Sequence, residues 1–71
     1  MSDSVYKIIE LVGTSTESWE QAAKHAVETA GKHLKDLRIA EVEMLDMHIE
    51  EGKPIVYRAK LKLSFKYHEE Y

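Results

Sequence analysis

The stretch that decides the fold is Ile55–Tyr67, which reads Ile-Val-Tyr-Arg-Ala-Lys-Leu-Lys-Leu-Ser-Phe-Lys-Tyr. Its odd positions are apolar or aromatic, and most of its even positions are polar or basic. Alternation with a period of two is typical of a β-strand with one buried face and one exposed face. Gly52 and Pro54 precede this pattern and indicate a turn. The sequence therefore predicts a strand over residues 54–67.

The segment before this turn is expected to form the other strand of a hairpin, over residues 37–50. Its apolar side chains occupy even positions at Val42 and Met44 but odd positions from Leu45 onward. One extra residue in a strand shifts its register by one, so a β-bulge would keep both sets on the same face. We therefore predict a bulge near Met44.

A strand and a helix are expected before the hairpin. β-Branched and aromatic residues predict a strand over residues 5–13. Apolar residues then recur at spacings of three and four, which indicates a helix over residues 16–35 with one apolar face. That face comprises Trp19, Ala22, Ala23, Ala26, Val27, Ala30 and Leu34. Ser15 is the expected N-cap, although Thr14 with Glu17 also fits a capping box.

The length of 71 residues and the mass of 8.2 kDa allow one domain, residues 1–71. The predicted order is strand, helix, strand, strand, an α+β fold with a three-stranded antiparallel sheet. The chain has no cysteine, which excludes disulfides and thiolate zinc sites. Hairpin strands of about 14 residues would extend ~45 Å, too far for one short helix to cover both faces. Copies of the same chain are the expected cover for the remaining apolar surface.

The charge pattern argues against nucleic acid as a partner, because the formal net charge is −3 and the isoelectric point is near 5.8. A basic stripe does run along the last strand, at Arg58, Lys60, Lys62 and Lys66. Acidic residues of the preceding strand are expected to neutralise most of it across the hairpin.

No membrane partner is expected either. No apolar stretch approaches the ~20 residues that span a bilayer. The first residues also lack the apolar core of a secretion signal, so we expect a cytoplasmic protein.

Several segments resemble the dodecins. They are Val5–Ser15, Ser18–Ala23, Ala40–Val42 and Tyr57–Leu61, within a match that extends from about Val5 to Lys66. The resemblance implies a sheet curled around the helix. It also implies a hollow homododecamer with tetrahedral symmetry.

The best-known dodecins store flavins, which stack between tryptophans and bind a glutamine at the isoalloxazine edge. The resemblance places Ile39 at the position of that tryptophan and Arg58 at that of the glutamine. Ile39 offers no π-face for stacking, and Arg58 is only a hydrogen-bond donor. His48 shares a strand face with Asp46 near the same pocket. The cofactor-binding candidates are therefore Ile39, Asp46, His48 and Arg58.

Other segments look more like the calcium dodecin subgroup, which lacks the stacking tryptophan: Asp36–Ala40, Asp46-Met47, Tyr57-Arg58 and Ser64–Lys66. This resemblance implies a dodecamer that binds Ca²⁺ or simply assembles. Glu17 matches a position where some family members place a metal-binding acid. It could equally be an acid favoured by the helix dipole.

Asp46 is the second metal candidate, because Ca²⁺ prefers carboxylate oxygens. In the bulged register it would lie opposite Arg58, and an ion pair across the hairpin explains it as well.

We therefore expect a dodecameric protein that stores or buffers a small ligand or a metal, with calcium as the favoured ligand. The alternatives are a dodecin that sequesters riboflavin or FMN, and a scaffold that binds a protein partner. No spacing selects a nucleophile together with its base, so no enzymatic activity and no catalytic residue are predicted.

Overall fold

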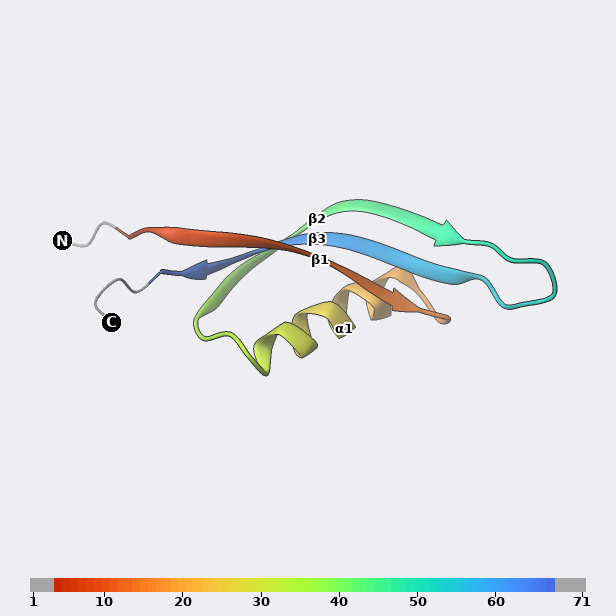
Figure 1. Ribbon diagram of the computed structural model, residues 1–71, viewed down its shortest axis with the longest axis horizontal. Helices are drawn as coiled ribbons and strands as arrows, with labels where there is room; N and C mark the ends of the chain where they lie inside the picture. Colours follow the sequence, from red (N-terminus) through yellow and green to blue (C-terminus); the bar gives the residue numbers. More distant parts are fainter. Residues whose placement is uncertain (1–3, 68–71) are drawn as a thin grey trace.

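The computed structural model describes residues 4–67, in which three strands and one helix follow the predicted order (Figure 1). They are β1 (Tyr6–Ser15), α1 (Trp19–Gly31), β2 (Leu37–His48) and β3 (Val56–Lys66). The strands form one antiparallel sheet in the order β1-β3-β2, so the last strand lies in the centre. The helix lies against one face of this sheet. The predicted fold class is therefore confirmed.

The molecule is elongated, with principal extents of 55 × 20 × 15 Å. Its radius of gyration is 14.7 Å, whereas a compact chain of this length would have about 11 Å. The hairpin of β2 and β3 projects beyond both α1 and the end of β1 (Figure 1). Much of the sheet is consequently left without a cover from its own chain. Within residues 4–67, no helix is long and apolar enough to cross a membrane.

The helix is shorter than predicted at both ends. It begins at Trp19 because Ser18 is the N-cap, with an extended backbone and a hydroxyl that accepts a hydrogen bond from the Gln21 N–H at 3.0 Å. The expectation that Ser15 caps the helix is wrong. Ser15 is the last residue of β1, and its hydroxyl accepts from the Glu17 N–H at 2.9 Å instead. The N-cap therefore lies three residues later in the chain than expected.

The strand ends differ from the predicted bounds by two residues or fewer. β1 extends past Gly13 to Ser15, because its last two residues pair with Arg58 and Tyr57 of β3. β2 ends at His48, and the turn that follows contains Gly52 with a positive φ of 80°. Such a φ is readily adopted by glycine, as the predicted turn requires.

The predicted bulge is present. The register of β2 against β3 shifts between Val42 and Met44, which leaves Glu43 as the extra residue. Beyond the shift, Leu45 lies opposite Ala59 and Asp46 lies opposite Arg58, as expected.

A second shift, between Leu37 and Ile39, had not been predicted. It makes Arg38 an extra residue and lets Leu37 pack against the core while Ile39 stays exposed.

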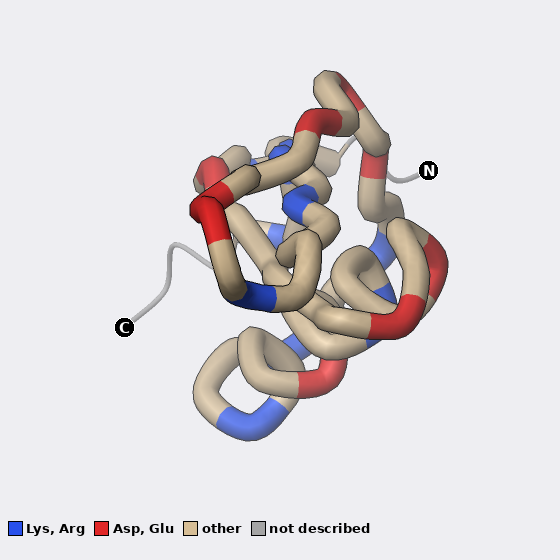
Figure 2. The backbone as a smooth tube through the Cα atoms, turned by 90° about the vertical axis from the view of Figure 1, so that its right-hand side faces the viewer, with Lys and Arg blue, Asp and Glu red and all other residues tan. Residues whose placement is uncertain are grey.

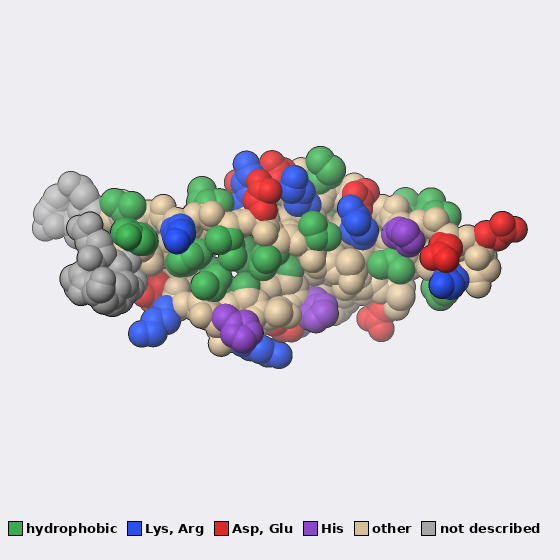
Figure 3. Space-filling view, in the orientation of Figure 1, with side chains coloured by type: hydrophobic (Ala, Val, Ile, Leu, Met, Phe, Trp, Pro, Cys, Tyr) green, Lys and Arg blue, Asp and Glu red, His purple; other side chains and the backbone are tan. Residues whose placement is uncertain are grey.

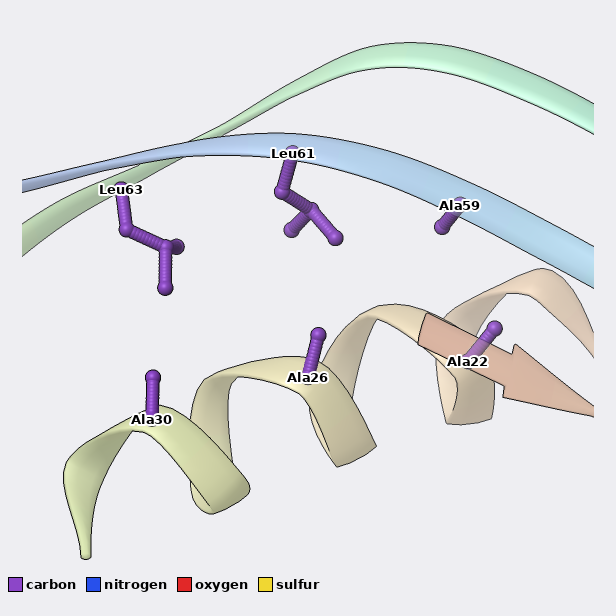
Figure 4. Close-up of a cluster of buried hydrophobic side chains, with 6 residues drawn as sticks. All are labelled: Ala22, Ala26, Ala30, Ala59, Leu61 and Leu63. Carbon is purple, nitrogen blue, oxygen red and sulfur yellow. The ribbon is translucent and has the colours of Figure 1, made fainter. Parts of the chain in front are cut away.

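The core lies between α1 and the centre of the sheet. One face of the helix contributes Ala22, Ala26 and Ala30, which point toward β3 (Figure 4). The residues of β3 that meet them are Ala59, Leu61 and Leu63. Small side chains on the helix let it approach the strands closely.

Candidate functional site

The candidate residues for ligand binding lie on the face of the sheet turned away from α1, which we call the outer face. Residues directly opposite one another in an antiparallel pair share a face, so the register defines cross-strand rows there. These rows are Ile8, Ser64 and Ile39; Glu10, Lys62 and Glu41; Val12, Lys60 and Met44; and Thr14, Arg58 and Asp46. Along the outer face, the edge-strand residues are thus apolar in the first and third rows and polar or charged in the second and fourth.

The last row contains a two-point ion pair between Asp46 and Arg58. The Arg58 Nε–H donates to Asp46 Oδ1 at 2.8 Å, and Nη2 donates to Oδ2 at 3.3 Å. The side chains remain 44% and 45% exposed, respectively. The hydrogen bond from Arg58 lowers the pKa of Asp46, and the same bond raises the pKa of Arg58. The sequence-based expectation of a cross-strand ion pair is met in this geometry.

The bulged residue Glu43 lies between two lysines of the central strand. Its carboxylate oxygens are 3.9 Å from the ammonium of Lys60 and 3.3 Å from that of Lys62. Glu10 of β1 approaches Lys60 from the other side at 3.8 Å. The hydrogen bond to Glu43 raises the pKa of Lys62. The basic stripe of β3 is thus compensated by acids on both neighbouring strands, and acidic and basic positions are interspersed along the chain (Figure 2).

The other two outer-face candidates do not contact this pair. Ile39 is 63% exposed and lies opposite Ser64, three rows from Asp46. His48 lies at the hairpin end, with Nε2 3.6 Å from a carboxylate oxygen of Glu50. The structure therefore brings Asp46 and Arg58 together but leaves Ile39 and His48 apart on the same face. The histidines visible in Figure 3 are separated from one another by other side chains.

Comparison with known proteins places the chain in a family. The model of the Dodecin family matches residues 5–68. The chain belongs to the dodecin family. Calcium dodecin of Mycobacterium tuberculosis is 49% identical over 63 residues, which is 89% of each protein.

Solved dodecin structures share the fold over almost the whole chain. The crystal structure of the M. tuberculosis protein, described as a calcium-chelating antigen with a novel calcium-binding site, has a TM-score of 0.85. It is 46% identical in sequence, over 96% of this chain and 97% of that one. The dodecin of Streptomyces coelicolor is 36% identical with a TM-score of 0.88, over 97% and 99% of the two chains. These similarities confirm the resemblance to dodecins and to the calcium dodecin subgroup.

The metal candidates of this dodecin do not converge within one chain. Glu17 lies in the connection between β1 and α1, exposed and just before the N-cap. Asp46 lies on the outer face, bound to Arg58. Among residues 4–67, no three acidic or histidine side chains gather closely enough to hold a metal ion.

One residue near the site was expected only to pack. Trp19 lies at the start of α1, and its indole N–H donates to the backbone oxygen of Asp46 at 2.9 Å. Its ring also meets Tyr57 edge to face, with ring centroids 5.1 Å apart. The apolar period of the helix predicted the packing of this dodecin tryptophan. Every residue has a backbone oxygen, so the residue types do not show which one accepts the hydrogen bond from the indole. The link to Asp46 could therefore not be predicted.

Proposed function

We propose that the protein forms a homododecameric shell that stores or buffers a small ligand, with Ca²⁺ as the favoured ligand. The observation that carries the proposal is the 49% identity with calcium dodecin, over 89% of both chains. The role proposed is binding and not catalysis.

The distribution of apolar surface supports assembly. Among residues 4–67, twelve large hydrophobic side chains are more than 40% exposed, and they lie on both faces of the sheet and at its ends. They are Val5, Tyr6, Ile8, Val12, Ile39, Val42, Met44, Leu45, Met47, Ile49, Ile55 and Tyr67. Exposed apolar patches of this extent mark surfaces that bury against a partner. Identical copies are the partner proposed here.

The chemistry of the candidate residues favours calcium over flavin. Ca²⁺ takes six to eight oxygen ligands, and no cluster within residues 4–67 supplies them. Symmetry-related copies would have to bring several carboxylates together, so calcium binding would depend on assembly. A flavin would meet the aliphatic Ile39 where the family resemblance calls for an aromatic ring. It would also meet Arg58, whose guanidinium already binds Asp46.

The first experiment is native mass spectrometry of the purified protein, followed by calorimetric titration with Ca²⁺ after chelation. A particle of about 98 kDa, twelve times the chain mass of 8.2 kDa, is expected, with Ca²⁺ bound in a fixed ratio. The variant Glu17→Gln should lower the number of ions bound per particle. Glu51→Gln, in the hairpin turn, is the matched control and should leave that number unchanged.

The alternatives predict other results. Strong quenching of added riboflavin, without calcium binding, would favour the flavin dodecin. A different protein that copurifies in fixed ratio, with no effect of Ca²⁺ on stability, would favour a scaffold. A monomer or dimer in the mass spectrum would contradict the proposed shell.

A further inference from the structure

The Asp46–Arg58 pair is held from the opposite side of the sheet by a single side chain. Trp19 donates its indole N–H to the backbone oxygen of Asp46 at 2.9 Å, in a partly buried position. The same ring packs against Tyr57, with centroids 5.1 Å apart and ring planes at 70°. Tyr57 immediately precedes Arg58 in β3. One indole thus contacts β2 and β3 next to the two members of the pair.

At this point β2 is paired with β3 alone. It is an edge strand, so only one of its sides is paired within the chain. The bulge at Glu43, three residues before Asp46, interrupts its regular pairing with β3. Among residues 4–67, the bond from Trp19 is the side-chain hydrogen bond that joins α1 to β2. The indole therefore gives the Asp46 backbone a second point of attachment, besides its pairing with β3.

The start of the helix is itself well fixed. Ser18 caps the first turn through the Gln21 N–H, and Ala22 N–H donates to the Ser18 backbone oxygen at 3.1 Å. Trp19 follows this cap directly as the first residue of the helix. Its indole is therefore anchored to a capped helix.

The geometry of the Asp46–Arg58 pair makes it sensitive to small changes in the position of the Asp46 backbone. A guanidinium and a carboxylate form two parallel hydrogen bonds only when their planes are aligned. The second bond, from Nη2 to Oδ2, is already long at 3.3 Å. A small rotation of β2 relative to β3 would open it first.

We propose that Trp19 is a positioning residue for the Asp46–Arg58 pair: its indole N–H fixes the backbone of Asp46 and so aligns the carboxylate with the guanidinium. The relevance of this role to ligand binding rests on the proposed function, in which both side chains belong to the ligand site. There, Trp19 sets the orientation of the charged groups that a ligand on the outer face would meet.

The test is the variant Trp19→Phe, which keeps an aromatic ring near Tyr57 and removes the donor. Arg38 and Arg58 are the arginines of the chain and Trp19 is its only tryptophan, so ¹⁵N labelling of these residue types yields few NMR signals. We expect the Arg58 Nε–H proton to exchange with water several-fold faster in the assembled variant. The Arg38 Nε–H should be unaffected, because its contact with Asp36 is made through Nη1 at 3.8 Å.

Val27→Ala is the control for general loss of stability, because it truncates the same helix more than two turns away. It should leave the exchange of the Arg58 Nε–H unchanged. Equal exchange in wild type and Trp19→Phe would overturn the proposal, as would an equal acceleration in Val27→Ala.

A second measurement applies if Trp19→Phe does not fold. In the wild type, the indole N–H proton of Trp19 should exchange with water more slowly than that of a free indole. It should also show a scalar coupling across the hydrogen bond to the carbonyl carbon of Asp46. Fast exchange without coupling would also overturn the proposal.

Titrations with Ca²⁺ and riboflavin test the proposed function separately. A wild type that binds neither would leave the NMR result on the positioning role intact.

Discussion

At the scale of single residues, the approach of α1 to the sheet depends on Gly13. A Cβ atom at this position would lie 2.1 Å from the backbone oxygen of Ala22 and 2.9 Å from the Cβ of Ala26. Both distances are shorter than van der Waals contact, and the nearer atom belongs to the helix backbone, which cannot rotate away. The glycine is needed for space and not for an unusual φ.

Gly13→Ala should therefore destabilise the protein by about 1–3 kcal/mol, the usual cost of overpacking. Gly31→Ala is the matched control, because a Cβ there meets only the Leu37 side chain at an ordinary 3.9 Å. Alanine in the last turn of the helix should be neutral or stabilising. Urea unfolding of both variants measures the difference. Equal stability of the two variants would contradict the close approach.

The ion pair of Asp46 predicts a pH dependence of stability. Arg58 lowers the pKa of this carboxyl in the folded chain, so the pair contributes fully above the unfolded pKa of about 3.9. The contribution is lost as the pH falls through the lower, folded pKa. The thermal midpoint of Asp46→Asn should therefore lie below that of wild type at neutral pH, and the gap should close in acid. A gap that does not narrow as the pH is lowered below about 3.9 would show that another contact causes it.

The pairing of Asp46 with Arg58 could be predicted because the alternation of β3 and the break in β2 together define one register. The N-cap could not be predicted in the same way. Thr14, Ser15 and Ser18 all carry hydroxyls that suit a cap, and the pattern does not say where β1 stops. The end of β1 depends on its pairing with β3, which is a tertiary contact.

At the scale of elements, β2 combines one irregularity that is visible in the sequence with one that is not. The bulge at Glu43 moves the apolar positions from even to odd numbers, which breaks the period of two. The shift at Arg38 separates Leu37 from Ile39, two apolar residues that a regular strand would place on the same face. Because both are apolar, no break in the pattern reveals that one enters the core and the other does not.

The cap of α1 gives a prediction at this scale. Ser18→Ala should destabilise the protein by about 1 kcal/mol, since the Gln21 N–H would lose its acceptor. Ser15→Ala should cost less, because its hydroxyl binds the Glu17 N–H in an exposed connection outside the helix. Thermal unfolding monitored by circular dichroism compares the two. The reverse order would mean that the helix starts earlier than Trp19.

At the scale of the whole molecule, a single chain leaves the edge strand β2 uncovered. The helix packs on β1 and β3, and most of β2 is exposed. Val42 and Leu61 lie opposite each other on the helix face, yet Val42 is 50% exposed and Leu61 only 1%. Val42 therefore belongs to the surface available for assembly, whereas Leu61 belongs to the core of the chain.

The same substitution at these two positions should have different results. Val42→Asp should prevent assembly and leave the secondary structure of the chain, because its side chain is half exposed. Leu61→Asp should unfold the chain, because an unpaired carboxylate would enter the core. Light scattering and circular dichroism measure the two effects. A full particle from Val42→Asp would exclude this face of β2 from the interface.

The order β1-β3-β2 also has a consequence for synthesis on the ribosome. The strand that both others pair with is the last of the three, so neither β1 nor β2 can begin to pair until residue 56 has emerged. Until then α1 has only β1 to pack on, and the alanines of its inner face cannot meet Leu61 and Leu63. The β2–β3 hairpin joins segments that are close in the sequence and can close quickly, whereas β1 must return across more than forty residues. The three-stranded sheet can therefore form only after β3 has emerged, and the core between α1 and β3 forms with it.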